Sequence, residues 1–136
     1  MAFRSIFNWG QAVLMKKAIF LIATLLGGVA VILGSFGAHL FDDYLILIER
    51  VDTFETALKY QFYHVFFLFI LGLSYDLFNE KFIKYAFYFC LIGMMLFSGS
   101  LYLLCLTDNS VFGMITPMGG LSLIFGWFFF LLAIKK

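Results

Sequence analysis

The sequence is poor in charge and cysteine, and each shortage excludes a class of protein or site. Charged residues make up 12% of the 136 residues, against about 25% in a typical soluble domain. The net charge is +1 and no basic patch is present, so the chain is not expected to bind nucleic acid. Cys90 and Cys105 lack any CxxC or Cys/His spacing, which predicts two small apolar residues and no structural zinc site.

Apolar residues are what the sequence has in abundance, at 64% of the chain. They form four long runs, at 18–41, 62–78, 82–106 and 115–134. A helix needs about 20 apolar residues to cross the roughly 30 Å hydrocarbon core of a bilayer. The runs therefore predict an all-α integral membrane protein, a four-helix bundle whose first partner is the lipid bilayer. Residues 15–136 are expected to form a single membrane domain.

The start of the chain has a separate character. Met15-Lys16-Lys17 ahead of an apolar run is typical of the beginning of a bacterial membrane protein, so residues 1–14 are interpreted as an N-terminal extension. A cleaved signal peptide ending near 35–38 is the alternative. Its apolar core would be longer than the usual 7–15 residues, which favours a retained first helix.

Basic residues are distributed unequally between the two sides of the predicted bundle. Only Arg50 and Lys59 fall on one side, and they stand among acidic residues. Because Lys and Arg concentrate in cytoplasmic connections, both termini are predicted to be cytoplasmic in a bacterial inner membrane. The basic residues on the predicted cytoplasmic side are Arg4, Lys16, Lys17, Lys81, Lys84, Lys135 and Lys136.

The connection between the first two runs contains apolar residues at intervals among charges. No Pro or Gly occurs between residues 38 and 71, and Asp52 or Thr53 can cap a helix start. We expect an amphipathic interfacial helix at about 45–61 that continues into the second membrane helix. Its charged face would lie toward water and its apolar face on the bilayer.

Small residues recur at helical spacing and predict where the membrane helices touch. In lipid, such residues let helix backbones approach each other closely. Three runs carry them, which favours a tight bundle over a wide pore. The predicted packing residues are Ala23, Gly27, Ala30, Gly34 and Ala38 in the first run, Gly99 in the third, and Gly119 and Gly120 in the fourth.

Polar residues gather at the outer half of the predicted bundle, where an unpaired polar group is costly. They are interpreted either as a network that fixes helix register or as a pocket for a small ligand, a lipid head group or a quinone. Two histidines on facing helices would also suit haem or a metal, but no third ligand is evident, so no metal and no cofactor is assigned. Glu55 would pair with His39 or His64 only if its side chain turned in under the end of the bundle; at the water boundary it would be a solvated charge. The residues of this predicted cluster are His39, Glu55, Thr56, Tyr60, Gln61, Tyr63, His64, Ser98, Ser100, Tyr102 and Thr116.

Several of these stretches resemble a known family. They are GSFGAH at 34–39, FETA at 54–57 with the YQ and YH pairs that follow, FSGSLY at 97–102, TPMGG at 116–120 and the GW pair at 126–127. In that order they resemble the small membrane proteins catalogued as domain of unknown function 423. The resemblance covers about residues 17–134 and implies four spans in a bacterial inner membrane. It implies no particular reaction.

Three classes of function are compatible with these patterns. The favoured prediction is a non-enzymatic accessory or structural membrane component, acting as a homo-oligomer or in a larger membrane complex. The alternative is an oligomeric protein that binds or transports a lipid or quinone, although no ionisable residue near a helix middle and no inverted repeat supports transport. An enzyme using His39, Glu55 and His64 ranks last, because Ser98 and Ser100 have no activating base nearby in sequence.

Overall fold

The computed structural model describes the backbone of residues 2–135 and the side chains of residues 10–135. The side chain of Arg4 and all of Lys136, both used in the topology prediction, lie outside these ranges. The described chain forms helices and no strands, and four of the helices are long and apolar enough to cross a membrane. The fold class is therefore confirmed. The helices are α1 (Ala2–His39), α2 (Asp42–Leu47), α3 (Val51–Ser74), α4 (Glu80–Thr107) and α5 (Val111–Ile134).

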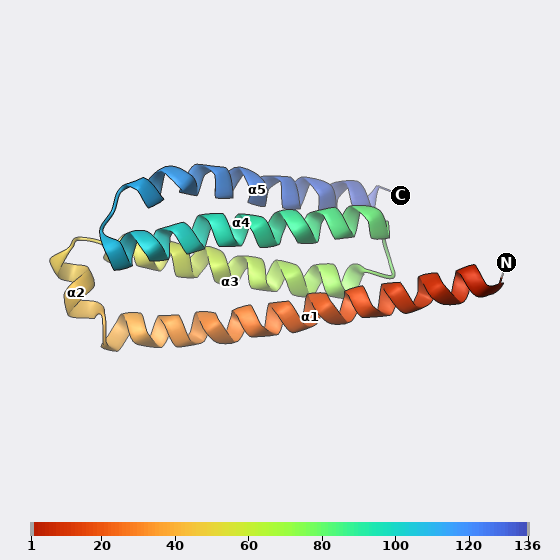
Figure 1. Ribbon diagram of the computed structural model, residues 1–136, viewed down its shortest axis with the longest axis horizontal. Coiled ribbons are helices and arrows are strands. Elements are labelled where there is room, and N and C mark those ends of the chain that lie inside the picture. Colours follow the sequence, from red (N-terminus) through yellow and green to blue (C-terminus); the bar gives the residue numbers. More distant parts are fainter. Residues whose placement is uncertain (1, 136) are drawn as a thin grey trace.

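The four long helices run side by side, and their packing follows the order α1, α3, α4, α5 (Figure 1). The contact between α4 and α5 is the most extensive, whereas α1 packs mainly on α3. The short helix α2 closes the end of the bundle where α1 ends and α3 begins. The start of α1, the α3–α4 turn and the end of α5 share the opposite end. We call these the α2 end and the terminal end.

The helix expected at 45–61 is divided in the structure. α2 ends at Leu47, and α3 begins at Val51 and continues straight into the membrane span. Glu49 adopts a left-handed conformation with φ 56°, the N–H of Arg50 donates to Leu45 O and that of Glu49 donates to Ile46 O. This pair of hydrogen bonds is a Schellman motif, which usually places glycine at the left-handed position. With Glu49 there, the sequence carried no visible signal for the break.

The helix α5 begins four residues earlier than the fourth apolar run. The side chain of Asn109 accepts a hydrogen bond from the N–H of Val111 at 3.0 Å, which caps the additional turn. Pro117 therefore lies inside α5, beyond its first turn. A proline there removes one hydrogen bond of the helix.

The small residues of α1 form most of the predicted contact with α3. Ala23 and Ala30 are fully buried, and a Cβ atom added to Gly34 would lie 3.2 Å from the side chain of Leu58. Ala38 is exposed, and Gly37 takes its place against the ring of Phe54. A step of four residues along a helix turns about 40° past a full turn. Two such steps, from Ala30 to Gly34 and on to Ala38, rotate the stripe away from α3, so the prediction for Ala38 is wrong.

The contact between α4 and α5 depends on Gly119. A Cβ atom on Gly119 would lie 2.3 Å from the backbone nitrogen of Phe97, whereas one on Gly120 would make only ordinary contact with the Phe97 ring. Gly99 is not a packing residue, since a Cβ atom there would meet nothing within 4 Å. Its neighbours Ser98 and Ser100 take the faces of α4 that lie against α3 and α5, which leaves Gly99 on an open face.

Candidate functional site

Gln61, which is 5% exposed, lies at the centre of the polar cluster and connects three helices. The hydroxyl of Tyr102 on α4 donates to Gln61 Oε1 at 2.8 Å, and Gln61 Nε2 on α3 donates to the carbonyl oxygen of Leu26 on α1 at 2.8 Å. A single amide side chain therefore fixes the relative positions of α1, α3 and α4. Such bonds stabilise membrane helix pairs by about 0.6 kcal/mol on average.

Serine hydroxyls make further connections between helices. Ser98 Oγ donates to the carbonyl of Ala57 on α3 at 2.8 Å, and Ser100 Oγ lies 2.8 Å from Thr116 Oγ1 on α5. Ser122 Oγ on α5 donates to the carbonyl of Phe89 on α4, also at 2.8 Å. α4 is thus bonded through polar side chains to both of its neighbours in the bundle.

His64 lies near the middle of α3 with both ring nitrogens engaged. The expectation that no ionisable residue lies near a helix middle is therefore wrong, because the helix begins at Val51 and not at the start of the apolar run at residue 62. Nδ1 lies 2.8 Å from the carbonyl oxygen of Tyr60, which can only accept, so Nδ1 carries the proton. Nε2 then accepts from the indole N–H of Trp127 on α5 at 3.4 Å. This assignment, made from the bonding partners, gives a neutral imidazole held among aromatic rings. The lone pair that a metal would need is directed at Trp127.

The structure separates several of the predicted site residues from this cluster. His39 and Tyr63 are exposed, and Glu55 is exposed and pairs with Lys59 at 2.7 Å instead of with a histidine. His39 and His64 are therefore not brought together around one ligand. Among the residues with described side chains, no three His, Cys, Asp or Glu residues come close enough to hold a metal ion.

Two predicted residues, Thr56 and Tyr60, take no part in the interhelical hydrogen bonds described above through their side chains. Thr56 is half-buried on α3. Tyr60 supplies its carbonyl oxygen to His64 and packs its ring 4.5 Å from the ring of Phe97, measured between centroids.

Sequence reasoning missed partners that the backbone or distant helices supply. The Leu26 carbonyl carried no signal, because any residue has one. Trp127 was visible as a polar aromatic residue next to Gly126, and Gly126 lies on the face of α5 that packs against Cys90. That small-residue face would have indicated that Trp127 borders the bundle. Its ring stacks on Phe67 with 4.1 Å between centroids.

At the α2 end, the charged residues divide into paired and unpaired groups. Arg50 donates twice to Asp108 Oδ1, from Nε at 3.1 Å and from Nη2 at 3.0 Å, which ties the start of α3 to the end of α4. The ion pair between Lys59 and Glu55 uses the other cation. Acidic side chains therefore outnumber the basic ones that remain to balance them. Within residues 10–135, the carboxylates at this end without an ion-pair partner are Asp42, Asp43, Glu49 and Asp52.

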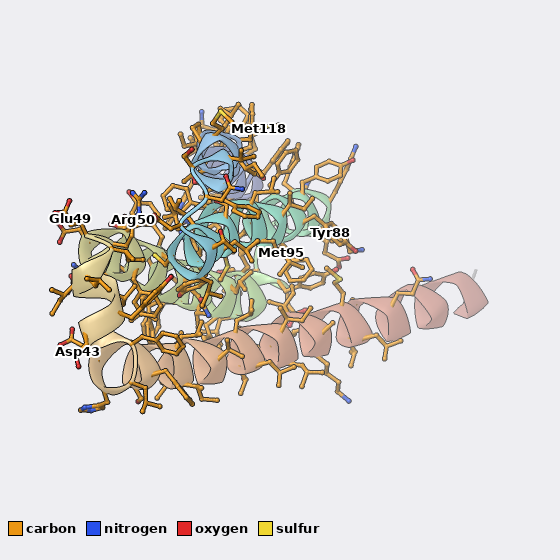
Figure 2. The ribbon with its side chains drawn as sticks, turned by 60° about the vertical axis from the view of Figure 1, so that its left-hand side comes forward. Asp43, Glu49, Arg50, Tyr88, Met95 and Met118 are labelled. Carbon is orange, nitrogen blue, oxygen red and sulfur yellow. The ribbon has the colours of Figure 1, made fainter. Side chains whose placement is uncertain are left out.

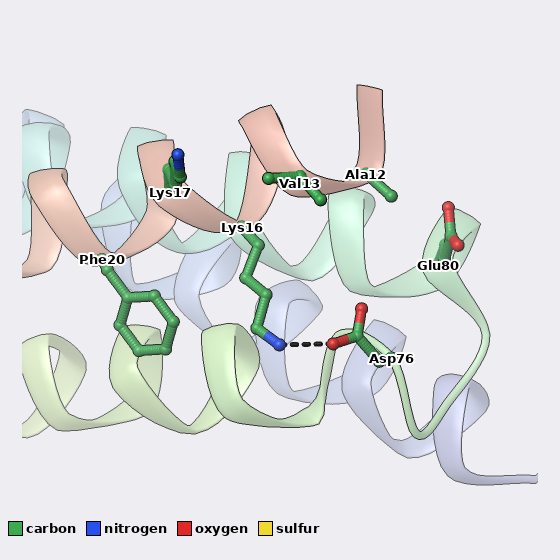
Figure 3. A pocket seen from close by; sticks show the side chains of 7 residues that line it. All are labelled: Ala12, Val13, Lys16, Lys17, Phe20, Asp76 and Glu80. Carbon is green, nitrogen blue, oxygen red and sulfur yellow. Dashed lines mark hydrogen bonds and ion pairs between the residues drawn. The ribbon is translucent and has the colours of Figure 1, made fainter. Parts of the chain in front are cut away.

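A large cavity lies at the terminal end, between α1 and the α3–α4 turn (Figure 3). Its volume is about 770 Å³, and an ion pair between Lys16 and Asp76 lies across it. Lys17 and Glu80 are exposed on its walls. The polar cluster does not border this cavity.

Two further cavities lie between α1 and α4. One, of about 310 Å³, is covered by α2 and lined almost wholly by apolar atoms; the other, of about 200 Å³, lies deeper in the membrane beside Gln61. They adjoin at Leu33 on α1 and Tyr102 on α4, which line both, and we treat the two cavities together. We call the pair the α1–α4 groove. It reaches the polar cluster at Gln61, Ser98 and Tyr102.

The family model described as protein of unknown function (DUF423) matches residues 33–120 of this chain. The chain belongs to the DUF423 family. The match contains all four spans in whole or part and all the predicted cluster residues, whereas Leu26 and Trp127 lie outside it.

Relatives of the DUF423 chain are membrane proteins. A UPF0382 membrane protein of Staphylococcus epidermidis is 35% identical over 120 residues, which cover 88% of this chain and 97% of that protein. The UPF0382 inner membrane protein YgdD of Escherichia coli K12 is 35% identical over 116 residues, covering 82% of this chain and 85% of that protein. No solved structure matches the chain. With four candidate spans, this DUF423 protein is membrane-integral.

Proposed function

We propose that the protein is a non-enzymatic accessory or structural component of the bacterial inner membrane. The observation that supports this proposal is that the buried side chains of the polar cluster are used to hold helices together. Gln61, Ser98 and Ser100 each bond to a neighbouring helix. A group committed to an interhelical bond can react or bind a ligand only if the bundle gives up that bond.

The same bonding argues against nucleophilic catalysis. A reactive serine needs a base within about 2.6–3.2 Å to accept its proton. Ser98 instead donates to a backbone carbonyl, and Ser100 lies against Thr116, which is no base. His64, the buried histidine, has its acceptor nitrogen directed toward Trp127.

The proposed activity is association with a second membrane component, either another copy of the chain or a different protein. The outward face of α1 favours this, because Leu21, Leu25 and Ile32 are each more than half exposed. Gly28 lies on the same stripe with open space around it. In a bilayer such a face contacts lipid or another helix, and a small residue on it permits close approach.

Cross-linking in membranes tests the association. In a background with Cys90→Ala and Cys105→Ala, Leu25→Cys is expected to give an adduct of one defined mass with a bifunctional thiol reagent or a photoreactive probe. Ile124→Cys is the control, since Ile124 is exposed to a similar degree on α5. Equal labelling of both positions, without a discrete adduct, would show that the chain acts alone.

The proposed orientation has both termini in the cytoplasm. It is supported by Lys16, Lys17, Lys81, Lys84 and Lys135 at the terminal end, against Arg50 and Lys59 at the α2 end. In intact cells with the same cysteine-free background, a membrane-impermeant maleimide should label Asp43→Cys and spare Lys84→Cys until the membrane is broken. The reverse pattern would invert the topology.

A further inference from the structure

We propose that the α1–α4 groove holds one acyl chain of an ethanolamine phospholipid, whose head group lies beside α2 at the acidic end of the bundle. This inference does not depend on the proposed association with a second component. It rests on the shape of the groove, on its depth in the bilayer and on the charge around its outer end.

The groove opens sideways toward the bilayer because α1 and α4 both pack on α3 and make little contact with each other. Met95, which is 69% exposed, lies on the side of α4 that faces α1 (Figure 2). The walls are mostly aliphatic and aromatic, and the outer part exposes almost no polar atoms. Water is therefore a poor occupant, and a hydrocarbon chain from the surrounding lipid is a good one.

The length of the groove suits an acyl chain. Along α4 it extends from Leu91 to Leu106, which is about 22 Å at 1.5 Å per residue. One leaflet contributes about 15 Å to a hydrocarbon core of about 30 Å. Because about 22 Å exceeds this share, the groove is long enough for a chain that begins near the interface beside α2 and spans the outer leaflet.

Gly99 makes room for this occupant. A Cβ atom at Gly99 would meet nothing within 4 Å, and Gly99 lines the inner part of the groove beside Gln61 and Tyr102. A larger residue there would project into the groove without displacing a neighbouring helix. Gly99 therefore provides a way to fill the groove while the bundle stays intact.

The charge at the outer end selects the head group. α2 carries Asp42 and Asp43 without an ion-pair partner, and Glu49, which follows it, is also unpaired within the part of the chain whose side chains are described. Figure 2 shows Asp43 and Glu49 pointing outward from this end. A head group with an ammonium is attracted there, whereas the net negative head group of phosphatidylglycerol is repelled.

Lipid retention tests the proposal. The purified chain is reconstituted into vesicles of equal parts phosphatidylethanolamine and phosphatidylglycerol, extracted in mild detergent and weighed by native mass spectrometry. We expect one retained phosphatidylethanolamine per chain, enriched about fivefold over phosphatidylglycerol, which corresponds to about 1 kcal/mol. Gly99→Phe should lose this lipid. Gly10→Phe should keep it, because Gly10 also has open space but lies outside the groove.

Further variants separate the two parts of the proposal. Gly99→Leu, a smaller filler, should lower retention even if the Phe variant folds poorly, and melting temperatures report folding for each. Asp42→Asn with Asp43→Asn should keep the lipid and lose the head-group preference; an unchanged preference would overturn the head-group assignment. Retention by Gly99→Phe equal to that of the unmodified chain would overturn the groove as the site. A retained quinone, or a lipid-free dimer, would overturn the choice of occupant.

Discussion

Replacing Gly119 with alanine should loosen the contact between α4 and α5, and the structure gives the size of the effect. The new Cβ atom would lie 2.3 Å from Phe97 N, 2.7 Å from Leu96 C and 2.7 Å from Phe97 Cα. These are backbone atoms that no rotamer change can move, so the two helices must separate by about 1 Å to restore contact distances. Forcing extra volume into a packed interface costs about 1–3 kcal/mol.

Gly99→Ala is the matched control for this prediction. Both substitutions place an alanine in the interior of a long helix, so each gains the same helix propensity, up to about 1 kcal/mol. The alanine at residue 99 meets open space, whereas the alanine at residue 119 meets the backbone of α4. The difference between the two variants therefore isolates the steric term.

The assay is thermal unfolding of the purified chain in one detergent, followed by intrinsic fluorescence or by loss of the monodisperse species. At this chain length, each kcal/mol should change the melting temperature by about 3–6 °C. We expect Gly99→Ala to melt at or above the unmodified chain and Gly119→Ala to melt several degrees below it. If the two variants melt together, the close approach of α5 to Phe97 is not a feature of the folded protein.

Three further substitutions test the polar contacts. Gln61→Leu removes the bond to Leu26 and leaves the Tyr102 hydroxyl without its acceptor. It should lower the free energy of unfolding by about 1 kcal/mol or more in the same assay. Tyr102→Phe added to Gln61→Leu should lower it little further, and additive losses would show that the two side chains do not interact. Trp127→Phe keeps the stacking surface but removes the donor to His64, so it should destabilise the fold by about 0.5–1.5 kcal/mol. Trp127→Leu should destabilise it more. Equal destabilisation by the two variants would mean that stacking contributes nothing. Arg50→Gln breaks a partly exposed ion pair with Asp108. The loss in the free energy of unfolding should be below about 1 kcal/mol and should become smaller in high salt. A loss that salt leaves unchanged would contradict a screened surface pair.

The number of spans and their approximate limits could be predicted because they depend on run length alone. Four runs of apolar residues leave a membrane chain few alternatives, since each backbone polar group must bond within a helix. The break between α2 and α3 could not be predicted in the same way. It lies where Glu49 adopts a left-handed conformation, and the adjacent Arg50 pairs with Asp108, a partner 58 residues away in the sequence.

For the candidate site, the sequence identified which residues would be buried and polar but not which of them would meet. Gln61 and Tyr102 were both predicted, and their bond follows from the packing of α3 on α4. His39 was grouped with them because it ends the first helix at the same depth, yet one helical position decides whether a side chain faces the bundle or the water. The predicted packing role of Gly99 is wrong because a small residue can lie either at a close helix contact or on an open face, and the sequence does not show which.

Gly99 and Gly119 together explain how one protein of this size can have both a rigid part and an open one. α4 and α5 approach so closely at Gly119 that a single methyl group would separate them. α1 is held by a stripe of small residues, the Gln61 bond to Leu26 and the ion pair between Lys16 and Asp76, and a hollow lies between it and α4. A small movement of α1 would therefore change the width of the groove with little effect on the α4–α5 pair. Any partner that contacts the outward face of α1 acts on the helix that borders the groove, so association and groove occupancy should influence each other by the same coupling free energy in both directions.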